Sequence, residues 1–169
     1  MKQSDFLKAV LPFKDRIFRL AKRLLVSTAE AEDATQELYL KLWKNKEKLK
    51  SYKSIEAFAI TMTKNYCFDR LKSKQASNLS LVHTNYKEKG ITLDKKIENY
   101  DAVAQVKLLI EKLPEQQKVI IQLRDIEQYE LDEICKIMEM KSTAVRVALS
   151  RARKKIRQEL IKRYNYGVS

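Results

Sequence analysis

The chain has 169 residues and a formal net charge of +13, and it contains only two glycines and two prolines. So few glycines and prolines argue against a turn-rich β-fold and favour helices. No apolar run approaches the roughly 20 residues that a bilayer span needs. The positive charge indicates a polyanionic partner, either nucleic acid or an anionic membrane surface.

No residue pattern predicts catalysis or a metal site. Cys67 and Cys135 lie far apart among apolar helical neighbours, which is typical of small core residues in a reducing compartment. The single histidine, His83, has no partner at a catalytic or metal-ligand spacing. Asp5 stands where a secretory signal would be basic and then apolar. We therefore expect a cytoplasmic protein that is not an enzyme and has no cofactor, metal or membrane-inserted segment.

Two amphipathic helices are predicted at the start of the chain. The first spans about residues 4–25, where apolar side chains recur at steps of three and four. Pro12 lies within it and would kink the helix or mark its true start. The second helix spans about 27–49, and Ser27 and Glu30 have the spacing of a capping box at its beginning.

The second helix carries an acidic and polar patch. Asp33, Gln36 and Glu37 are expected to lie together on its exposed face, where a partner could bind. The alternative is structural, because acidic residues in the first turns of a helix interact favourably with its dipole.

A basic segment leads into a third helix, predicted at about residues 55–74. Residues 41–53 hold six lysines and one glutamate and end in a loop. The helix has a polar, basic edge near Tyr66, formed by Lys64, Asn65, Arg70, Lys72 and Lys74. Aromatic rings among cations suit unpaired nucleic acid, since rings stack on bases and cations follow phosphates. A core tyrosine beside solvated lysines would give the same pattern. The side chains expected to face inward are Ile55, Phe58, Ala59, Met62, Tyr66 and Leu71.

The helical periodicity disappears after residue 75. Residues 76–100 are interpreted as a linker of roughly 25 residues, which could extend to about 80 Å. Asp101 is then expected to cap a helix, and Pro114 to begin the next. The tail, 164–169, is expected to fray. The apolar stripes of these two helices are Val103, Val106, Leu109, Ile110 and Leu113, then Val119, Ile120, Leu123 and Ile126.

Residues 130–157 have the pattern of a helix-turn-helix. A short helix is predicted by the spacing of Leu131, Ile134, Cys135 and Met138. After a short break, Ser142 is expected to cap a second helix. The buried stripe of that helix would be Val145, Leu149, Ala152 and Ile156. Two short helices joined by a tight turn, with the second basic and exposed, are typical of DNA-binding proteins.

The charges support DNA binding by this second helix. Residues 141–163 contain nine bases and one acid, whereas 124–139 contain six acids and two bases. A merely solvated helix usually mixes the two signs. An antiparallel helical hairpin with a soluble basic face remains the alternative. The overall prediction is an all-α chain of two small helical domains, 1–75 and 101–163, joined by a flexible linker.

Three segments resemble the extracytoplasmic-function (ECF) group of RNA polymerase sigma factors, in the sigma-70 superfamily. AEDATQELYLKLW is similar to the "AED…QE…W" helix of that group, and AFAITMTKNYCFDRLK to its "AWL…IARN…DxLR" helix. LPEQQKVIIQLRDIEQYELDEICKIM and TAVRVALSRARKKIR are similar to its C-terminal helix-turn-helix. The segments occur in the family's order and cover most of the chain. Two other classes remain open: a stand-alone helix-turn-helix transcriptional regulator and a basic helical adaptor for protein or membrane.

The resemblance implies partners and contact residues. Core RNA polymerase would bind Asp33, Gln36, Glu37 and Leu40. The minus-ten promoter element would be recognised and melted by Lys50, Ser51, Tyr52, Lys53, Ser54, Lys64, Asn65, Arg70 and Lys72. The minus-thirty-five element would be recognised by Ser142, Thr143, Arg146, Val147, Ser150, Arg151, Arg153 and Lys154. Members of the group are commonly held by an anti-sigma factor, which is therefore an expected partner.

The chain departs from the family pattern at the turn of the helix-turn-helix. Glu139 stands where the family has glycine. A non-glycine residue must then hold a positive φ, or the turn must differ. The residues that would face the bases also differ, so no promoter sequence can be transferred.

Overall fold

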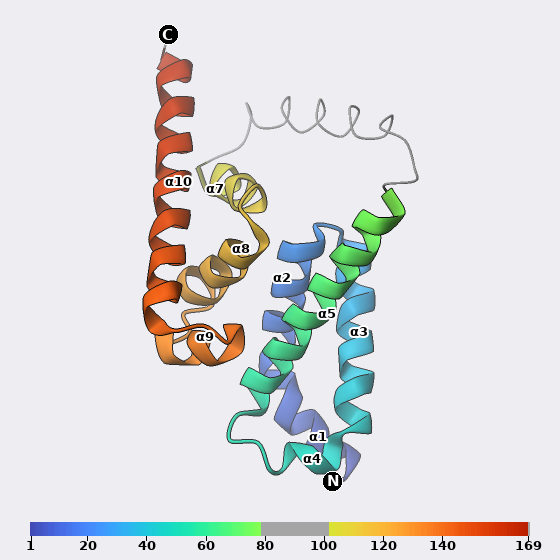
Figure 1. Cartoon of the computed structure of the whole chain (residues 1–169). Coiled ribbons are helices and arrows are strands. Elements are labelled where there is room, and N and C mark those ends of the chain that lie inside the picture. Colours follow the sequence, from blue (N-terminus) through green and yellow to red (C-terminus); the bar gives the residue numbers. More distant parts are fainter. Residues whose placement is uncertain (79–101, 169) are drawn as a thin grey trace.

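The computed structural model describes residues 1–78 and 102–168, which are helical and contain no strand (Figure 1). The predicted cap Asp101 and most of the predicted linker lie outside these residues. The N-terminal domain consists of α1 (Gln3–Val10), the 3₁₀ turn η1 (Leu11–Phe13), α2 (Lys14–Leu25), α3 (Thr28–Lys44), α4 (Lys46–Leu49) and α5 (Ile55–Asn78). The C-terminal domain consists of α7 (Ala102–Glu111), α8 (Glu115–Ile121), the π-helical segment η2 (Gln122–Ile126), α9 (Leu131–Met138) and α10 (Ser142–Val168). The predicted all-α fold with two helical domains is confirmed.

The first domain packs α2, α3 and α5 around one apolar core. Ile17, Leu20 and Leu24 of α2 meet Leu38 of α3 and Ile60 of α5, and all five are almost fully buried. Cys67 is also buried in this core, and burial raises the pKa of its thiol to about 12. It is therefore a small core residue, as predicted, and its thiolate is disfavoured at neutral pH.

Several helix boundaries differ from the predicted ones. Pro12 does not kink one long helix but divides it into α1, η1 and α2, because proline lacks the N–H of a helical hydrogen bond. The predicted second helix ends at Lys44, and α4 is a separate turn. Two helices extend beyond their predicted ends: α5 continues to Asn78, and α10 continues to Val168 through the tail expected to fray.

The predicted capping box is formed only in part. The Ser27 hydroxyl accepts a hydrogen bond from the Glu30 N–H at 3.3 Å. The Glu30 carboxylate does not complete the box, because it pairs with Lys74 of α5. The acidic start of α3 is therefore also fixed to the neighbouring helix.

The second domain has the predicted helix-turn-helix, with two errors in its apolar stripes. Ile134 of α9 and Val145 of α10 are fully buried, as predicted. Val103 and Ile126, which were expected to face inward, are 63% and 40% exposed. Ile126 is displaced because it ends the π-helical segment, whose wider turn rotates the residues away from 3.6-residue periodicity.

The turn between α9 and α10 takes the first of the two predicted alternatives, in which a non-glycine residue holds a positive φ. Glu139 has φ 53° and ψ 45°, in the left-handed region. Its N–H is shared between the carbonyls of Cys135 and Lys136, the latter at 3.4 Å, and Met140 N–H donates to the Cys135 carbonyl at 3.0 Å. A side chain in this region costs about 1 kcal/mol relative to glycine. The first helical bond of α10 is accepted by the Lys141 carbonyl, so the cap lies one residue before Ser142.

Replacing Glu139 with glycine is expected to stabilise the protein by up to about 1 kcal/mol, because the positive φ then has no Cβ penalty. Equilibrium denaturant unfolding measures the difference. Glu139→Gln is the control, since it removes the charge and keeps the Cβ atom. A glycine variant no more stable than the glutamine variant would show that the turn is unstrained.

The two domains pack against each other through α2 and α5 on one side and α8 and α9 on the other (Figure 1). The Arg19 guanidinium donates two hydrogen bonds to the Glu127 carboxylate, one of them at 2.8 Å. The Tyr129 hydroxyl donates to Glu56 at 2.6 Å, and Glu56 also pairs with Arg16. This closed arrangement was not predicted from the sequence.

Candidate nucleic-acid interface

α10 exposes a continuous polar and basic face opposite its buried stripe. Val145, Leu149 and Ala152 are buried against the rest of the domain. The predicted minus-thirty-five contacts are all exposed on the helix, at Ser142, Thr143, Arg146, Val147, Ser150, Arg151, Arg153 and Lys154. The first turns of a recognition helix are the part that meets base edges in the major groove. The geometry of α10 is therefore suited to duplex DNA.

A basic hollow lies along one flank of this face. It is formed by α10 together with the end of η2 and the start of α9, and its lining is Arg124, Leu131, Arg146, Leu149, Ser150, Arg153, Lys154 and Arg157. Five of these side chains are cations, so an anion such as a backbone phosphate is the ligand that the hollow favours. Arg124 was not among the predicted contacts, because it precedes the helix-turn-helix in the sequence.

Arg153 is held by a partner within the protein. Its Nε and Nη2 donate to the Asp125 carboxylate at 3.0 and 2.5 Å, and this interaction raises the pKa of the guanidinium. The bidentate pair fixes η2 against α10. Arg153 therefore has a positioning role in this arrangement, whereas Arg146 has no such pair among the contacts of the described residues.

The loop before α5 presents an aromatic surface. The rings of Tyr52 and Phe58 are stacked with centroids 4.3 Å apart, and Tyr52 remains 40% exposed. One face of Tyr52 is thus packed against the domain and the ring stays accessible. Asn65 lies seven residues after Phe58, on the same face of α5 and about 10 Å further along the axis. Tyr52 therefore lies beside the start of α5, and Asn65 is exposed two turns further along that helix.

Lys64 does not belong to the exposed edge in this arrangement. Its side chain is buried, and Nζ donates a hydrogen bond to the Ile137 carbonyl of α9 at 2.8 Å. Burial lowers the pKa of this ammonium, and only the charge of Glu139 acts in the opposite direction. The other predicted residues of this region, Lys50, Ser51, Lys53, Ser54, Arg70 and Lys72, are exposed.

The predicted polymerase contacts form one exposed stripe on α3. Asp33, Gln36, Glu37 and Leu40 are all exposed at helical spacing, and Leu40 is 55% exposed. An apolar groove continues from this stripe toward α1, where Leu7 and Leu11 border it. The helices that pack on the C-terminal domain are α2 and α5, so the stripe stays uncovered in the closed arrangement.

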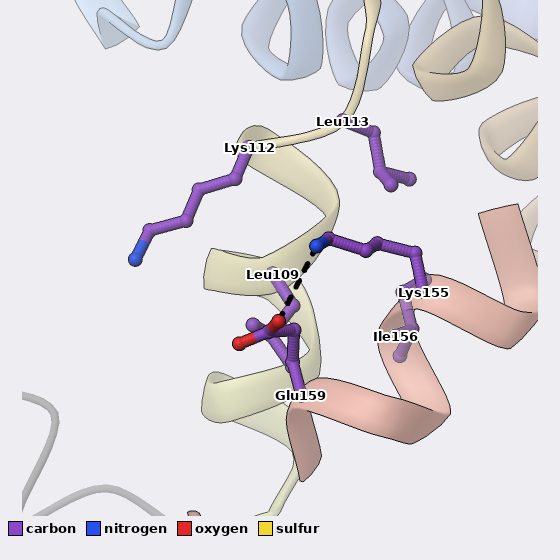
Figure 2. Close-up of a pocket in the computed structure, with 6 residues that line it drawn as sticks. All are labelled: Leu109, Lys112, Leu113, Lys155, Ile156 and Glu159. Carbon is purple, nitrogen blue, oxygen red and sulfur yellow. Dashed lines mark ion pairs between the residues drawn. The ribbon is translucent and has the colours of Figure 1, made fainter. Parts of the chain in front are cut away.

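A smaller pocket between α7 and α10 lies outside the predicted contacts. Figure 2 shows Leu109, Lys112, Leu113, Lys155, Ile156 and Glu159 around it. Lys155 and Glu159 form an ion pair at 3.4 Å, and Lys112 points away from it. The cation of Lys155 and the carboxylate of Glu159 therefore neutralise each other at this pocket.

Two comparisons of sequence locate known families on both domains. The profile of sigma-70 region 2 matches residues 10–77, and that of sigma-70 region 4 matches residues 104–156. The ECF RNA polymerase sigma factor SigW of Bacillus subtilis (strain 168) is 26% identical over 94% of this chain and 90% of its own length. The chain belongs to the sigma-70 family, in its ECF group.

Further relatives agree with this family. The ECF sigma factor SigK of Mycobacterium bovis is 38% identical over 66 residues, which are 38% of this chain and 35% of that protein. The fold matches that of the sigma factor RpoE from Bartonella quintana, solved in complex with the anti-sigma factor NepR. The TM-score is 0.74 at 18% identity, over 94% of this chain and 97% of that one.

Membership in the family gives each domain of this sigma factor a name. The N-terminal domain corresponds to region 2 and the C-terminal domain to region 4. A sigma factor binds core RNA polymerase and directs promoter recognition, and this chain has an exposed surface suited to each task. Among the described residues, no helix is both long and apolar enough to cross a membrane.

Proposed function

We propose that this sigma factor divides its work between its two domains. Region 2, about residues 1–75, binds core polymerase through the α3 stripe and opens the minus-ten element along α5. Region 4, about residues 101–163, binds the minus-thirty-five duplex through α10, and residues 76–100 join the two. One observation supports this division. The exposed aromatic surface beside α5 and the exposed basic face of α10 lie in different domains, and these domains match separate sigma regions.

Within region 4, the exposed side chains have different roles. Arg146 and Ser150 contact base edges, and Lys154 and Arg157 contact phosphates from the basic hollow. Arg153 orients α10 through Asp125. Within region 2, Tyr52 provides a stacking surface and Asn65 a hydrogen-bonding group for successive unpaired bases.

The protein acts by binding in the cytoplasm, where RNA polymerase works, and it has no catalytic role of its own. We also propose an anti-sigma factor as a partner. The structural relative was solved with such a protein, and its fold covers nearly the whole of this chain. The α3 stripe and the adjoining groove are the uncovered surface on which an inhibitor would compete with polymerase.

Mixing the protein with core RNA polymerase and a library of random duplexes tests the function. Transcription should begin only when the protein is present, and the enriched duplexes should share two sequence elements at a fixed spacing. Binding of DNA without any effect on initiation would instead identify a stand-alone regulator.

Tyr52→Ala and Asn65→Ala are each expected to slow promoter opening, because each removes a contact with unpaired bases. Loss of one stacking contact costs about 1–3 kcal/mol, so Tyr52→Ala should weaken binding to the single non-template strand roughly 5- to 150-fold. A fluorescent base in the minus-ten element reports opening in the complex with core polymerase. Val26→Ala is the control. Val26 is the residue that follows α2, it is 52% exposed, and it is not among the predicted DNA contacts. Normal opening by both variants would place the melting site elsewhere.

A further inference from the structure

Val147 is an exposed apolar residue on the outer face of the recognition helix. It lies in the second turn of α10, two residues after the buried Val145, and it is 42% exposed. Before Ile161, it is the one large exposed apolar side chain among the described residues of α10. Recognition helices place this part of the helix against base edges.

The surroundings of Val147 leave its methyl groups accessible. An apolar hollow lies beside it, between the start of α8 and the start of α10, and Ala144 and Ala148 belong to its lining. These alanines are one turn before and one residue after Val147, and they are too short to cover it. Thr143 and Arg151 flank it one turn away in each direction. An apolar group of the DNA can therefore reach Val147 between two polar contacts.

The chemistry of the major groove limits what that group can be. Base edges in the major groove carry hydrogen-bond donors and acceptors, and their one apolar substituent is the 5-methyl group of thymine. Valine neither donates nor accepts a hydrogen bond, so the thymine methyl group is the base substituent that it contacts most favourably. A β-branched side chain in a helix is also confined almost entirely to one χ1 rotamer, so its methyl groups are already in place before binding.

We infer that Val147 contacts the 5-methyl group of a thymine in the minus-thirty-five element and selects thymine at that position. The inference rests on the proposed function of α10 and adds the base and the chemical group that one residue recognises. Burial of one methyl group corresponds to a factor of about four in affinity.

Thymine-to-uracil substitution tests this contact, because uracil lacks the methyl group and keeps the hydrogen-bonding edge. The complex of the full-length protein with core polymerase is bound to a duplex enriched from the random library. Each thymine of the upstream element is replaced singly by deoxyuridine, and affinities are compared by competition. With the wild-type protein, replacement of thymine by uracil at one position should lower the affinity about fourfold. Val147→Ala should bind the thymine duplex more weakly by a similar factor and should no longer distinguish thymine from uracil.

Ile161→Ala is the matched control, because Ile161 is a 54% exposed apolar residue further along the same helix. It should retain the wild-type preference for thymine. Equal affinity of the wild-type complex for every uracil duplex would overturn the inference, as would a preference for thymine that persists in Val147→Ala. Equal affinity for every uracil duplex is also the result expected if the hollow beside Val147 binds a protein segment instead of a base. Failure of the complex to enrich any duplex would overturn the proposed function and this inference with it.

Discussion

Glu127→Arg is expected to separate the two domains of the free protein. The Glu127 side chain is 2% exposed, and its carboxylate accepts two hydrogen bonds from Arg19 across the interface. The variant loses these bonds and places two like charges together. Loss of one partner from a buried charge pair commonly costs about 2–5 kcal/mol of interaction free energy. Because Arg19 is 47% exposed and solvent screens its charge, we expect a cost of about 2 kcal/mol for the interface. That corresponds to a roughly 30-fold shift from the closed to the open form.

Small-angle scattering measures this change as a larger radius of gyration. The double variant Arg19→Glu with Glu127→Arg should restore the wild-type value, because it re-forms the ion pair with reversed charges. Glu130→Arg is a second control with the same change of charge three residues further on. Glu130 is 78% exposed, and its ion pair with Arg124, at 3.8 Å, lies within the C-terminal domain. A Glu127→Arg protein as compact as the wild type would show that the other interface contacts suffice for closure.

Asp33→Ala combined with Gln36→Ala is expected to weaken binding to core polymerase about 10- to 100-fold. This range corresponds to about 1.4–2.7 kcal/mol for the pair, within what truncation of central interface residues can cost. The two side chains lie one turn apart on the exposed stripe of α3. The fold should be unaffected, since exposed substitutions change stability by about 0.5 kcal/mol or less. Titration with labelled core enzyme gives the affinity, and thermal unfolding checks the fold.

Glu32→Ala provides the control for charge. Glu32 is exposed on the same helix at the margin of the stripe, about 100° around the axis from Asp33, and it is not among the predicted contacts. It should bind core polymerase as the wild type does. If Glu32→Ala weakens binding as much as the double variant, then the general negative charge of α3 attracts polymerase and the stripe is not a specific contact.

The local features of this fold could be predicted from the sequence. The helix-turn-helix follows from apolar spacing and charge, and the positive φ of Glu139 follows from a glycine missing at a turn that requires one. Local rules also account for the Ser27 cap. They were less successful at Val103, at the start of α7, and at Ile126, at the end of the π-helical segment, where an apolar residue remains exposed. Apolar periodicity predicts which side of a helix is buried, but it does not show which other helices pack against that side.

The position of Lys64 shows what local rules could not provide. Its spacing placed it on a basic edge beside Asn65, and Asn65 is indeed exposed. Lys64 is instead covered by α9, whose Ile137 carbonyl accepts its hydrogen bond from a residue 73 positions away. A contact over that distance depends on how the two domains pack against each other. No pattern within α5 contains that information, and the same holds for Arg19 and Glu127.

The burial of Lys64 affects how the protein distributes itself among competing DNA sites. A chain with net charge +13 is attracted to any duplex, and a genome offers about 10⁶–10⁹ non-specific sites. Closure withdraws Lys64 from that competition while α3 stays uncovered. With one cation fewer on its surface, the closed form should show a flatter dependence of non-specific binding on salt than an opened variant.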